Sequence, residues 1–507
     1  MSLPSLLATA AEHFPNHIAL IHREQQYTYA QVQQSVFALA QRFVALGLQP
    51  GDRVAVCLNK SYLNVVSLFA ASLAGGIIIP VNIHLKPKQL EYVLTDARIT
   101  FFISTLERAN SIRHYLAEAN IQGLIAGCEQ AELEENWQHW ADISTSSSVA
   151  YDWPKLKPQL PAMILYTSGS TGQPKGVLIS QQNLLAGANS VAEYLNLSVS
   201  DRVLLVLPLF FDYGFNQITS IFAVGGSVVL HDYLLPGDVI KKINKWQVTG
   251  LACVPPLFHQ IFDKDWSGVS SLRYLTNSGG HLSESVIQAI QKKLPSVALF
   301  LMYGLTESFR STYLKPNLVQ SKPGSVGQAI PNAVVTIANE LGRECGVGEV
   351  GELVHSGPLV SLGYWENKSA TDKVYRPYKG EPAVWSGDLA KRDDDGDITI
   401  VGRRDEQIKV SGYRVSPAEI ESVLQQLSSV SEVIALGVPH PILGQAIIVV
   451  LTAHKDCTKQ NYLAHCQKQL PNYMVPSLIE EKTSLNKTAT GKFDRSSYRI
   501  FYQKYFQ

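Results

Sequence analysis

The sequence lacks any excess of charge of one sign. Its 507 residues carry 43 Lys plus Arg and 43 Asp plus Glu, so the formal net charge is zero. Without a basic excess, composition gives no electrostatic footprint for nucleic acid or for an anionic membrane surface, and we expect neither as a partner. Hydrophobic residues make up 46% and charged residues 17%, which excludes a disordered chain and is typical of a folded protein of several compact units.

Cysteine is scarce and scattered along the chain. The cysteines form no CxxC pair and no cluster with histidine at metal-ligand spacing. His465 stands beside Cys466 on an expected helix, but adjacent helical positions do not converge on one metal ion. The sequence therefore predicts free thiols in a reducing compartment. The six cysteines are Cys57, Cys128, Cys253, Cys345, Cys457 and Cys466.

Signals for export or membrane insertion are also missing. The N-terminus has neither the basic start nor the long apolar core of a secretory signal. Residues 61–85 carry no formal charge, as a membrane span would, but they contain Asn64, Gly75, Gly76 and Pro80. We expect a helix over 64–73 that ends at the glycines and a buried strand over 77–79, which is a soluble α/β unit. These observations predict a cytoplasmic protein.

Up to about residue 400 the sequence alternates strand patterns with helix-length segments. Short apolar runs at 53–57, 162–166, 203–207 and 227–230 predict buried strands. This alternation indicates an α/β fold with mostly parallel sheets, organised as a large N-terminal domain of several subdomains.

Beyond residue 400 the pattern becomes that of a small α+β domain. Ser416, Pro417 and Glu419 predict a helix start with a capping box. The apolar face Ile420, Val423, Leu424 and Leu427 follows, then strands over 432–438 and 446–452 and another helix. We therefore predict domains at 1–403 and 404–507, with a hinge near Asp405.

The stretch 166–176, Y-T-S-G-S-T-G-Q-P-K-G, directly follows the expected strand 162–166. Its glycines let backbone N–H groups approach phosphate oxygens, its hydroxyls donate further hydrogen bonds, and Lys175 supplies positive charge. It is not a Walker A loop, because Gly176 follows the lysine where Ser or Thr is required. Phosphate binding is the favoured interpretation, and an ordinary Gly/Ser loop is the alternative.

The order T-S-G-S-T-G-x-P-K-G resembles the phosphate loop of the adenylate-forming superfamily, which includes acyl-CoA synthetases and the adenylation domains of nonribosomal peptide synthetases. Further motifs in the family's order are Y-G-L-T-E at 303–307, S-G-D at 386–388, G-R-R-D-E-Q-I-K at 402–409 and T-G-K at 490–492. The resemblance thus spans Thr167 to Lys492. It implies activation of a carboxylic acid by ATP and Mg²⁺ as an acyl-AMP, followed by transfer to a thiol.

The resemblance also implies roles for individual residues. Lys492 would be the catalytic lysine, Lys175 would bind phosphate, Thr306 would hydrogen-bond the α-phosphate, and Glu307 would hold Mg²⁺. Asp388 would accept hydrogen bonds from the ribose hydroxyls and Arg403 would contact ribose or phosphate. The sequence G-G-H-L at 279–282 departs from the commoner family motif G-x-x-P-L, and this difference leaves the role of His281 open. The remaining ATP-binding positions implied are Thr167, Ser168, Gly169, Ser170, Thr171, Gly172, Gly279, Gly280, His281, Tyr303 and Gly304.

The family's small C-terminal domain rotates between the two reactions, and the motif match makes Asp405 the hinge. Residues 409–412 would lie on the face used for thioester formation. A hinge must absorb a large φ/ψ change, so its place at a domain junction is mechanically sensible.

The acid pocket is matched by the same motifs. Asp212, in F-D-Y-G-F-N-Q at 211–217, occupies the position whose carboxylate pairs with an α-ammonium group in amino-acid adenylation domains. The alternative is that Asp212 faces a loop amide and caps a helix. This sequence motif resembles that of free-standing L-prolyl–carrier protein ligases, and the resemblance predicts L-proline as the substrate. Arg310 is unexpected in such a pocket and either turns outward or signals another substrate. The implied pocket positions are Asp212, Tyr213, Asn216, Cys253, Thr276, Ser278, Met302 and Arg310.

Three function classes follow. The first is an amino acid ligase that loads the phosphopantetheine thiol of a separate carrier protein, as in nonribosomal peptide and secondary metabolite biosynthesis. The second is an acyl-CoA synthetase for a non-amino acid, with coenzyme A as the thiol. The third, a non-catalytic nucleotide-binding module, is disfavoured by Lys492 and Glu307.

Overall fold

The structure is a computed structural model that describes residues 2–126, 137–139, 151–167, 174–280, 282–404, 406, 408–410, 413–441, 443–453, 458–470, 472–488 and 492–506. The chain forms two compact units. The first comprises residues 1–321, 329–334 and 355–384, and the second comprises 322–328, 335–354 and 385–507. The second unit contains the predicted C-terminal domain together with strands that precede it. The predicted boundary at 403/404 and the hinge stay predictions, because Asp405 lies outside the described residues.

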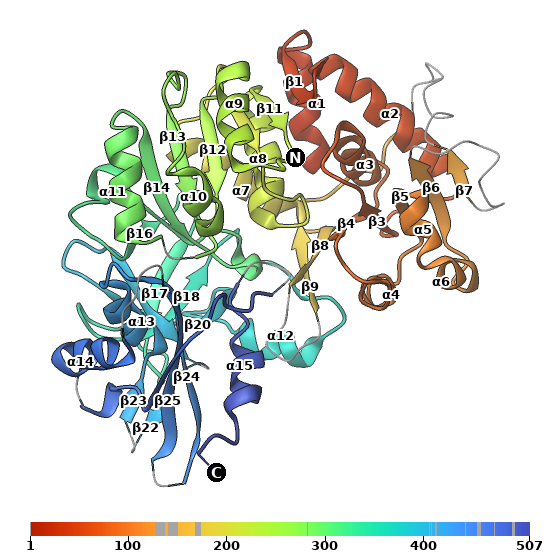
Figure 1. Cartoon of the computed structure of the whole chain (residues 1–507). Helices are drawn as coiled ribbons and strands as arrows, with labels where there is room; N and C mark the ends of the chain where they lie inside the picture. The colour runs from red at the N-terminus through yellow and green to blue at the C-terminus, as the bar shows by residue number, and fades with distance from the viewer. Residues whose placement is uncertain are drawn as a thin grey trace. The chain divides into compact units, whose positions relative to one another are not determined.

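The first sheet of unit 1 is mainly parallel, as expected (Figure 1). Its order within the unit is β15-β14-β13-β12-β10-β11-β1-β2, with β15 and β2 antiparallel to their neighbours at the two ends. The strand Ser227–Leu230 has the predicted bounds, and Arg202–Leu205 begins one residue before its prediction. The strands are β1 (Ile18–His22), β2 (Gln25–Thr28), β10 (Arg202–Leu205), β11 (Ser227–Leu230), β12 (Gly250–Cys253), β13 (Tyr274–Asn277), β14 (Ala298–Tyr303) and β15 (Thr312–Leu314).

The second sheet of unit 1 has the order β19-β9-β8-β4-β3-β5-β6-β7. Strands β8 to β7 along this order run parallel, whereas β9 is antiparallel to β8 and β19 to β9. The phosphate-loop sequence joins β8 to β9. The strands are β3 (Arg53–Cys57), β4 (Ile77–Pro80), β5 (Phe101–Thr105), β6 (Gln122–Ala126), β7 (Trp137–His139), β8 (Pro161–Thr167), β9 (Lys175–Ser180) and β19 (Gly363–Tyr364).

Both faces of the second sheet are buried, as expected for parallel strands covered by helices. Alternation along β3 sends Val54 and Val56 into a core shared with the first sheet, and Ala55 and Cys57 into a core beneath α4. The helices are α1 (Leu3–His13), α2 (Tyr29–Ala45), α3 (Tyr62–Leu73), α4 (Pro87–Asp96), α5 (Leu106–Asn110), α6 (Arg113–Glu118), α7 (Gln181–Tyr194), α8 (Asp212–Val224), α9 (Pro236–Trp246), α10 (Pro255–Ile261), α11 (Glu284–Lys293) and α12 (Lys368–Val374), with short 3₁₀ turns η3 (Thr306–Ser308) and η4 (Pro316–Leu318).

The uncharged stretch 61–85 is the soluble α/β unit that the sequence predicts. It forms α3, which ends before the positive-φ Gly75, and then the buried strand β4. Among the described residues, no helix is both long and apolar enough to span a bilayer.

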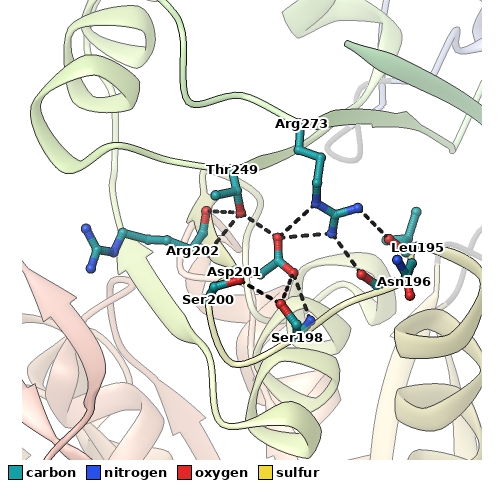
Figure 2. Close-up of polar contacts among 8 residues, drawn as sticks. All are labelled: Leu195, Asn196, Ser198, Ser200, Asp201, Arg202, Thr249 and Arg273. Carbon is teal, nitrogen blue, oxygen red and sulfur yellow. Dashed lines mark hydrogen bonds and ion pairs between the residues drawn. The ribbon is translucent and has the colours of Figure 1, made fainter. Parts of the chain in front are cut away.

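A buried carboxylate ties together the ends of several elements in the first sheet (Figure 2). Asp201 is 3% exposed and precedes β10. Its Oδ1 accepts hydrogen bonds from Thr249 Oγ1 at 2.7 Å and from Arg273 Nη2 at 3.0 Å, and its Oδ2 accepts one from the Ser198 backbone N–H at 2.8 Å. Arg273 also donates to the Leu195 carbonyl oxygen at 2.9 Å. The charge is therefore matched, and this cluster is structural.

The second unit contains two sheets. The order β17-β18-β20-β21-β16 forms one, and β23-β22-β25-β24, with β26 pairing β25, forms the other. The long hairpin β24–β25 contains the two strands predicted at 432–438 and 446–452. The strands are β16 (Ser325–Ala329), β17 (Val334–Ala338), β18 (Gly351–Ser356), β20 (Ala383–Arg392), β21 (Ile398–Arg403), β22 (Ile408–Val410), β23 (Tyr413–Val415), β24 (Val430–His440), β25 (Gly444–Ala453) and β26 (Leu478–Glu481).

Helices cover the second of these sheets on both faces. Helices α13 (Pro417–Gln425) and α14 (Lys459–Gln469) pack on one face, and α15 (Arg495–Tyr502) on the other. The helix start at Ser416 is confirmed, but the predicted capping box is wrong. Ser416 makes no cap hydrogen bond, because its hydroxyl donates to the Val401 carbonyl oxygen at 2.6 Å.

One group of carboxylates in unit 2 has the spacing of a metal site but is matched by a lysine. Asp393, Asp395 and Asp397 bring oxygens within 4.8 Å of one another. The ammonium group of Lys322 lies 2.8, 2.7 and 2.5 Å from these three carboxylates in turn. The ammonium group of Lys322 thus already supplies a positive charge to these carboxylates, so the cluster gives no reason to expect a metal ion.

Candidate active site at the carboxyl edge of the first sheet

Many of the acid-pocket and nucleotide residues predicted from motifs lie at one edge of the first sheet. Parallel strands place their carboxyl ends together, and open α/β sheets bind ligands outside that edge. Cys253 ends β12, Ser278 follows β13, and Tyr303 ends β14. The segments that follow β13 and β14 carry Gly279, Gly280, Gly304, Thr306 and Glu307, and Asp212 lies in the segment that follows β10.

Asp212 is the first residue of α8, a position set by a tight preceding loop. A Cβ on Gly214 would stand 1.9 Å from the Pro208 carbonyl oxygen, so only glycine fits there. Phe211 is the N-cap and makes no side-chain cap bond. Asp212 is therefore the first residue of the helix and not its N-cap, and the helix N-terminus stabilises its negative charge.

A small pocket brings Asp212 together with Thr306, the residue predicted to bind the α-phosphate. Asn216 lies one helical turn after Asp212 on the same face, and its Oδ1 is buried without a hydrogen-bond partner among the described residues. Most of the lining is apolar. The pocket is lined by Met163, Leu165, Ile179, Asn183, Leu184, Asp212, Phe215, Asn216, Thr219, Thr306, Phe309, Leu359 and Ser361.

Four other predicted pocket residues contact one another in a second cluster: Tyr213, Thr276, Met302 and Arg310. The Tyr213 and Thr276 hydroxyls are 2.6 Å apart, and the Arg310 guanidinium lies 4.5 Å from the centre of the Tyr213 ring. Arg310 Nη1 is 3.7 Å from Met302 Sδ. Burial raises the pKa of the Tyr213 hydroxyl above its usual range, so this hydroxyl stays protonated near neutral pH. Arg310 thus turns inward, and the alternative that it turns outward is wrong.

The backbone between Tyr303 and Arg310 explains this inward turn. A Cβ on Gly304 would lie 2.5 Å from the Phe309 carbonyl oxygen, so the segment folds back closely on itself. Phe309 has φ 62° and ψ −100°, a conformation that costs energy in a non-glycine residue. Its ring fits against Gly187, and the reversal directs the next side chain, Arg310, into the interior.

The predicted metal ligand Glu307 is held by a tyrosine that no sequence motif indicated. The Tyr364 hydroxyl donates to Glu307 Oε1 at 2.7 Å, and Lys175 Nζ lies 5.5 Å from the centre of the same ring. The structure therefore brings Lys175 and Glu307 to one tyrosine. The only signal in the sequence was an aromatic pair, Tyr364-Trp365, after Gly363.

The phosphate-loop sequence is anchored at both ends. Thr167 ends β8 and pairs in register with Lys175, the first residue of β9. A polar pocket beside Lys175 is lined by Tyr92, Thr95, Asp96, Arg98, Pro174, Lys175, Gly176, Tyr364, Trp365, Glu366 and Asn367. The predicted phosphate ligands Ser168, Gly169, Ser170, Thr171 and Gly172, and also His281, lie outside the described residues.

Three predicted residues belong to the second unit. Asp388 on β20 faces Arg403 on β21, and Arg403 Nη1 lies 3.1 Å from Asp388 Oδ1. The two residues predicted to contact the ribose and phosphate are therefore paired with each other. Lys492 is exposed, and its carbonyl oxygen accepts a hydrogen bond from the Thr488 N–H at 2.7 Å.

Comparison with known proteins decides the family. Residues 7–365 match the model of the AMP-binding enzymes, and residues 419–492 match the model of the AMP-binding enzyme C-terminal domain. The chain belongs to the AMP-binding enzymes. The predicted adenylate-forming family is thereby confirmed.

The relatives of this AMP-binding enzyme include proteins of two kinds. It is 29% identical to the long-chain-fatty-acid–CoA ligase of Salmonella typhimurium, over 98% of this chain and 94% of that protein. It is 27% identical to a plipastatin synthase protein of Bacillus subtilis, over 98% of this chain but 19% of that protein.

Solved structures confirm the fold of the enzyme. The ATP-bound MatB of Rhodopseudomonas palustris superposes with a TM-score of 0.90 at 24% identity, covering 100% of both chains. The o-succinylbenzoate coenzyme A synthetase of Bacillus subtilis in complex with ATP and magnesium gives a TM-score of 0.86 at 25% identity, covering 97% of this chain and 98% of that one. The α/β class with a large N-terminal and a small C-terminal domain is confirmed.

This AMP-binding enzyme is an AMP-forming acid–thiol ligase that uses ATP and Mg²⁺. The site fits a hard cation, because Glu307 offers carboxylate oxygens and Tyr364 orients one of them, Oε1.

Proposed function

We propose that the enzyme activates an amino acid as its aminoacyl-AMP and transfers the aminoacyl group to a phosphopantetheine thiol. The observation that carries this proposal is the shared pocket of Asp212 and Thr306. The α-ammonium of an amino acid is one carbon away from the reacting carboxylate, so its counter-ion must lie close to the group that binds the α-phosphate.

The surroundings of Asp212 support this choice. Leu165, Ile179 and Phe215 make much of the pocket wall apolar. A carboxylate beside such a wall is stabilised by any positive charge that enters the pocket, and a substrate ammonium group would bring that charge. An acid without an amino group has no such group to offer.

In the proposed reaction a substrate carboxylate oxygen attacks the α-phosphorus of ATP, pyrophosphate leaves, and an acyl-AMP forms. Lys175 and Thr306 hold phosphate oxygens, and Lys492 neutralises the charge that develops between the carboxylate and the phosphate. Glu307 would hold Mg²⁺, which when bound would supply further neutralisation of phosphate charge. In the second step the thiol sulfur bonds to the acyl carbon, its proton is lost, and AMP leaves.

Two further parts of the proposal are the identity of the thiol acceptor and the identity of the amino acid. We propose a separate carrier protein as the acceptor, because the chain resembles a segment of the Bacillus subtilis plipastatin synthase protein. L-Proline is the substrate predicted from the sequence motif at 211–217, and no geometric feature of the pocket adds support to this prediction.

A second candidate function is an acyl-CoA synthetase for a non-amino acid. The observation that favours it is the match to the Salmonella typhimurium fatty-acid–CoA ligase over 94% of that protein's length. In that case coenzyme A would be the acceptor, and Asp212 would be held by protein groups alone.

ATP–pyrophosphate exchange with panels of amino acids and plain carboxylic acids separates the two candidates. The proposal expects exchange with an amino acid and much weaker exchange with the deaminated analogue of the same size. Asp212→Asn should lower kcat/KM for the amino acid by about 100-fold or more, the scale of leaving a buried ammonium unpaired, while the analogue is affected less. Equal losses for both acids would refute amino-acid recognition and support the acyl-CoA synthetase.

A further inference from the structure

Arg310 is a buried cation with no buried anion beside it among the described residues. Its side chain is 2% exposed, and it is the largest of the fully buried side chains described. It contacts the Tyr213 ring, the Phe309 ring and Met302 Sδ, and its Nε has no hydrogen-bond partner in that part of the chain. Within the same described ranges, Arg310 makes no hydrogen bond to an oxygen atom.

This arrangement is unfavourable for the protein alone. A guanidinium group has five N–H donors and stays charged, so in the interior it requires acceptor oxygens or anions. The aromatic rings replace only part of the lost hydration. Elsewhere in the same unit, Arg273 meets its buried carboxylate Asp201 directly at 3.0 Å (Figure 2). A ligand that brings oxygen atoms to the guanidinium group would supply the acceptors that these contacts lack.

The position of Arg310 links it to the acid substrate. Phe309, the preceding residue, lines the pocket with Asp212, and Tyr213, on which the guanidinium stacks, directly follows Asp212. The negative side chain of Asp212 thus lines the pocket, and the positive side chain of Arg310 belongs to the residue that follows the lining residue Phe309. Thr306, on the Asp212 side, marks the end where the reacting carboxylate would lie.

We propose that Arg310 is a specificity-determining residue that pairs with a second anionic group on the acid substrate, distal to the carboxylate that is adenylated. Resting on the proposed function, this makes the substrate an amino acid with an acidic side chain. Its α-ammonium faces Asp212 and its side-chain carboxylate meets Arg310. The apolar ring of proline would leave the guanidinium unpaired.

The side chain of the amino acid is the first variable in the test. ATP–pyrophosphate exchange is measured for two sets of amino acids matched in size. The first set is L-aspartate, L-asparagine and L-2-aminobutyrate, and the second is L-glutamate, L-glutamine and L-norvaline. L-Proline and O-phospho-L-serine are measured as well. The wild-type enzyme should prefer an acidic member of a set over its uncharged partners by about 100-fold or more in kcat/KM, as expected for a buried charge pair.

The protein side chain is the second variable. Arg310→Met should abolish that preference, Arg310→Lys should keep part of it, and Arg310→Glu should favour L-ornithine over L-glutamate. Arg273→Met is the matched control: it removes another arginine from the same unit, should lower the thermal midpoint and should leave the ratio between acidic and uncharged substrates unchanged. If Arg310→Met does not fold, the wild-type preference and Arg310→Lys still decide.

The outcomes separate this inference from the proposed function. A wild-type preference for an uncharged amino acid, with a ratio that Arg310→Lys does not alter, would overturn the inference and leave amino-acid activation intact. Exchange with glutarate or succinate but with no amino acid, abolished by Arg310→Met, would overturn amino-acid activation and retain the pairing of Arg310 with a second anion.

Discussion

Tyr364 donates its hydroxyl hydrogen to Glu307 Oε1 across 2.7 Å. A carboxylate fixed by a hydrogen bond to one oxygen presents the other in a set direction, which suits a ligand to a hard cation. Because Lys175 Nζ lies 5.5 Å from the centre of the Tyr364 ring, one side chain contacts both the predicted metal ligand and the lysine predicted to bind phosphate.

The first prediction tests Tyr364 as a positioning residue. Tyr364→Phe keeps the ring next to Lys175 but removes the donor to Glu307. We expect kcat/KM for adenylation to fall about 10- to 150-fold, since a hydrogen bond to a charged group contributes about 1.5–3 kcal/mol. The Mg²⁺ concentration required for half-maximal exchange should rise. A loss of activity with unchanged Mg²⁺ dependence would show that the hydroxyl does not act through the metal ligand.

The second prediction concerns Lys492. If its charge serves only the adenylation step, Lys492→Ala should reduce acyl-AMP formation by roughly two to four orders of magnitude, the scale of removing a preorganised charge. Transfer from chemically supplied acyl-AMP to the thiol should continue at the wild-type rate. Single-turnover measurements of the two steps provide the check, and an equal loss in both would make the role of Lys492 structural.

The positions of strands and helices could be predicted from the sequence where the hydrophobic pattern was strong and fitted only one kind of element. The runs at 53–57 and 227–230 have the predicted bounds because each is a buried strand bordered by turn or helix residues. The capping box at Ser416 was wrong for a physical reason. Its hydroxyl has a tertiary acceptor, the Val401 carbonyl oxygen, which no local pattern reveals.

The candidate site was predictable only as far as motifs reach. They predicted that Asp212, Thr276 and Met302 belong to one site, and the fold brings them to one sheet edge. The inward turn of Arg310 depends on the strained backbone of Phe309, and the contact between Tyr364 and Glu307 joins residues far apart in the sequence. Neither a backbone reversal nor a long-range hydrogen bond leaves a periodic signal.

The third prediction is a loss of stability in mild acid caused by His355. This side chain is 0% exposed, its Nδ1 lies 2.8 Å from Ser311 Oγ, and burial lowers its pKa to about 3 from an ordinary value near 6.5. Between these values the unfolded chain binds a proton that the folded chain excludes, so stability is full above pH 6.5 and falls as pH decreases. The slope should be about 1.4 kcal/mol per pH unit.

Urea unfolding between pH 7 and pH 5 measures this contribution, in a range where most carboxylates remain ionised. His355→Asn should be less stable than wild type at pH 7 and should lose that part of the pH dependence. His13→Asn, at an exposed histidine, is the control and should retain the wild-type slope. A His355→Asn profile parallel to that of wild type would show that the imidazole is accommodated in its charged form.

The last prediction concerns the hinge that the motif match assigns to Asp405. The two half-reactions of the family require two orientations of the small domain, so the backbone at the hinge must adopt two φ/ψ states. Proline fixes φ near −65° and restricts the preceding residue. Asp405→Pro should therefore hold one orientation while both units stay folded, and we expect it to retain pyrophosphate exchange and lose thioester formation.

Asp405→Ala, which leaves φ unrestricted, is the control and should support both steps. The opposite selectivity would still require a hinge at this position, with the thioester-forming orientation held. If the folded proline variant performs both half-reactions at wild-type rates, Asp405 is not the residue about which the domain moves.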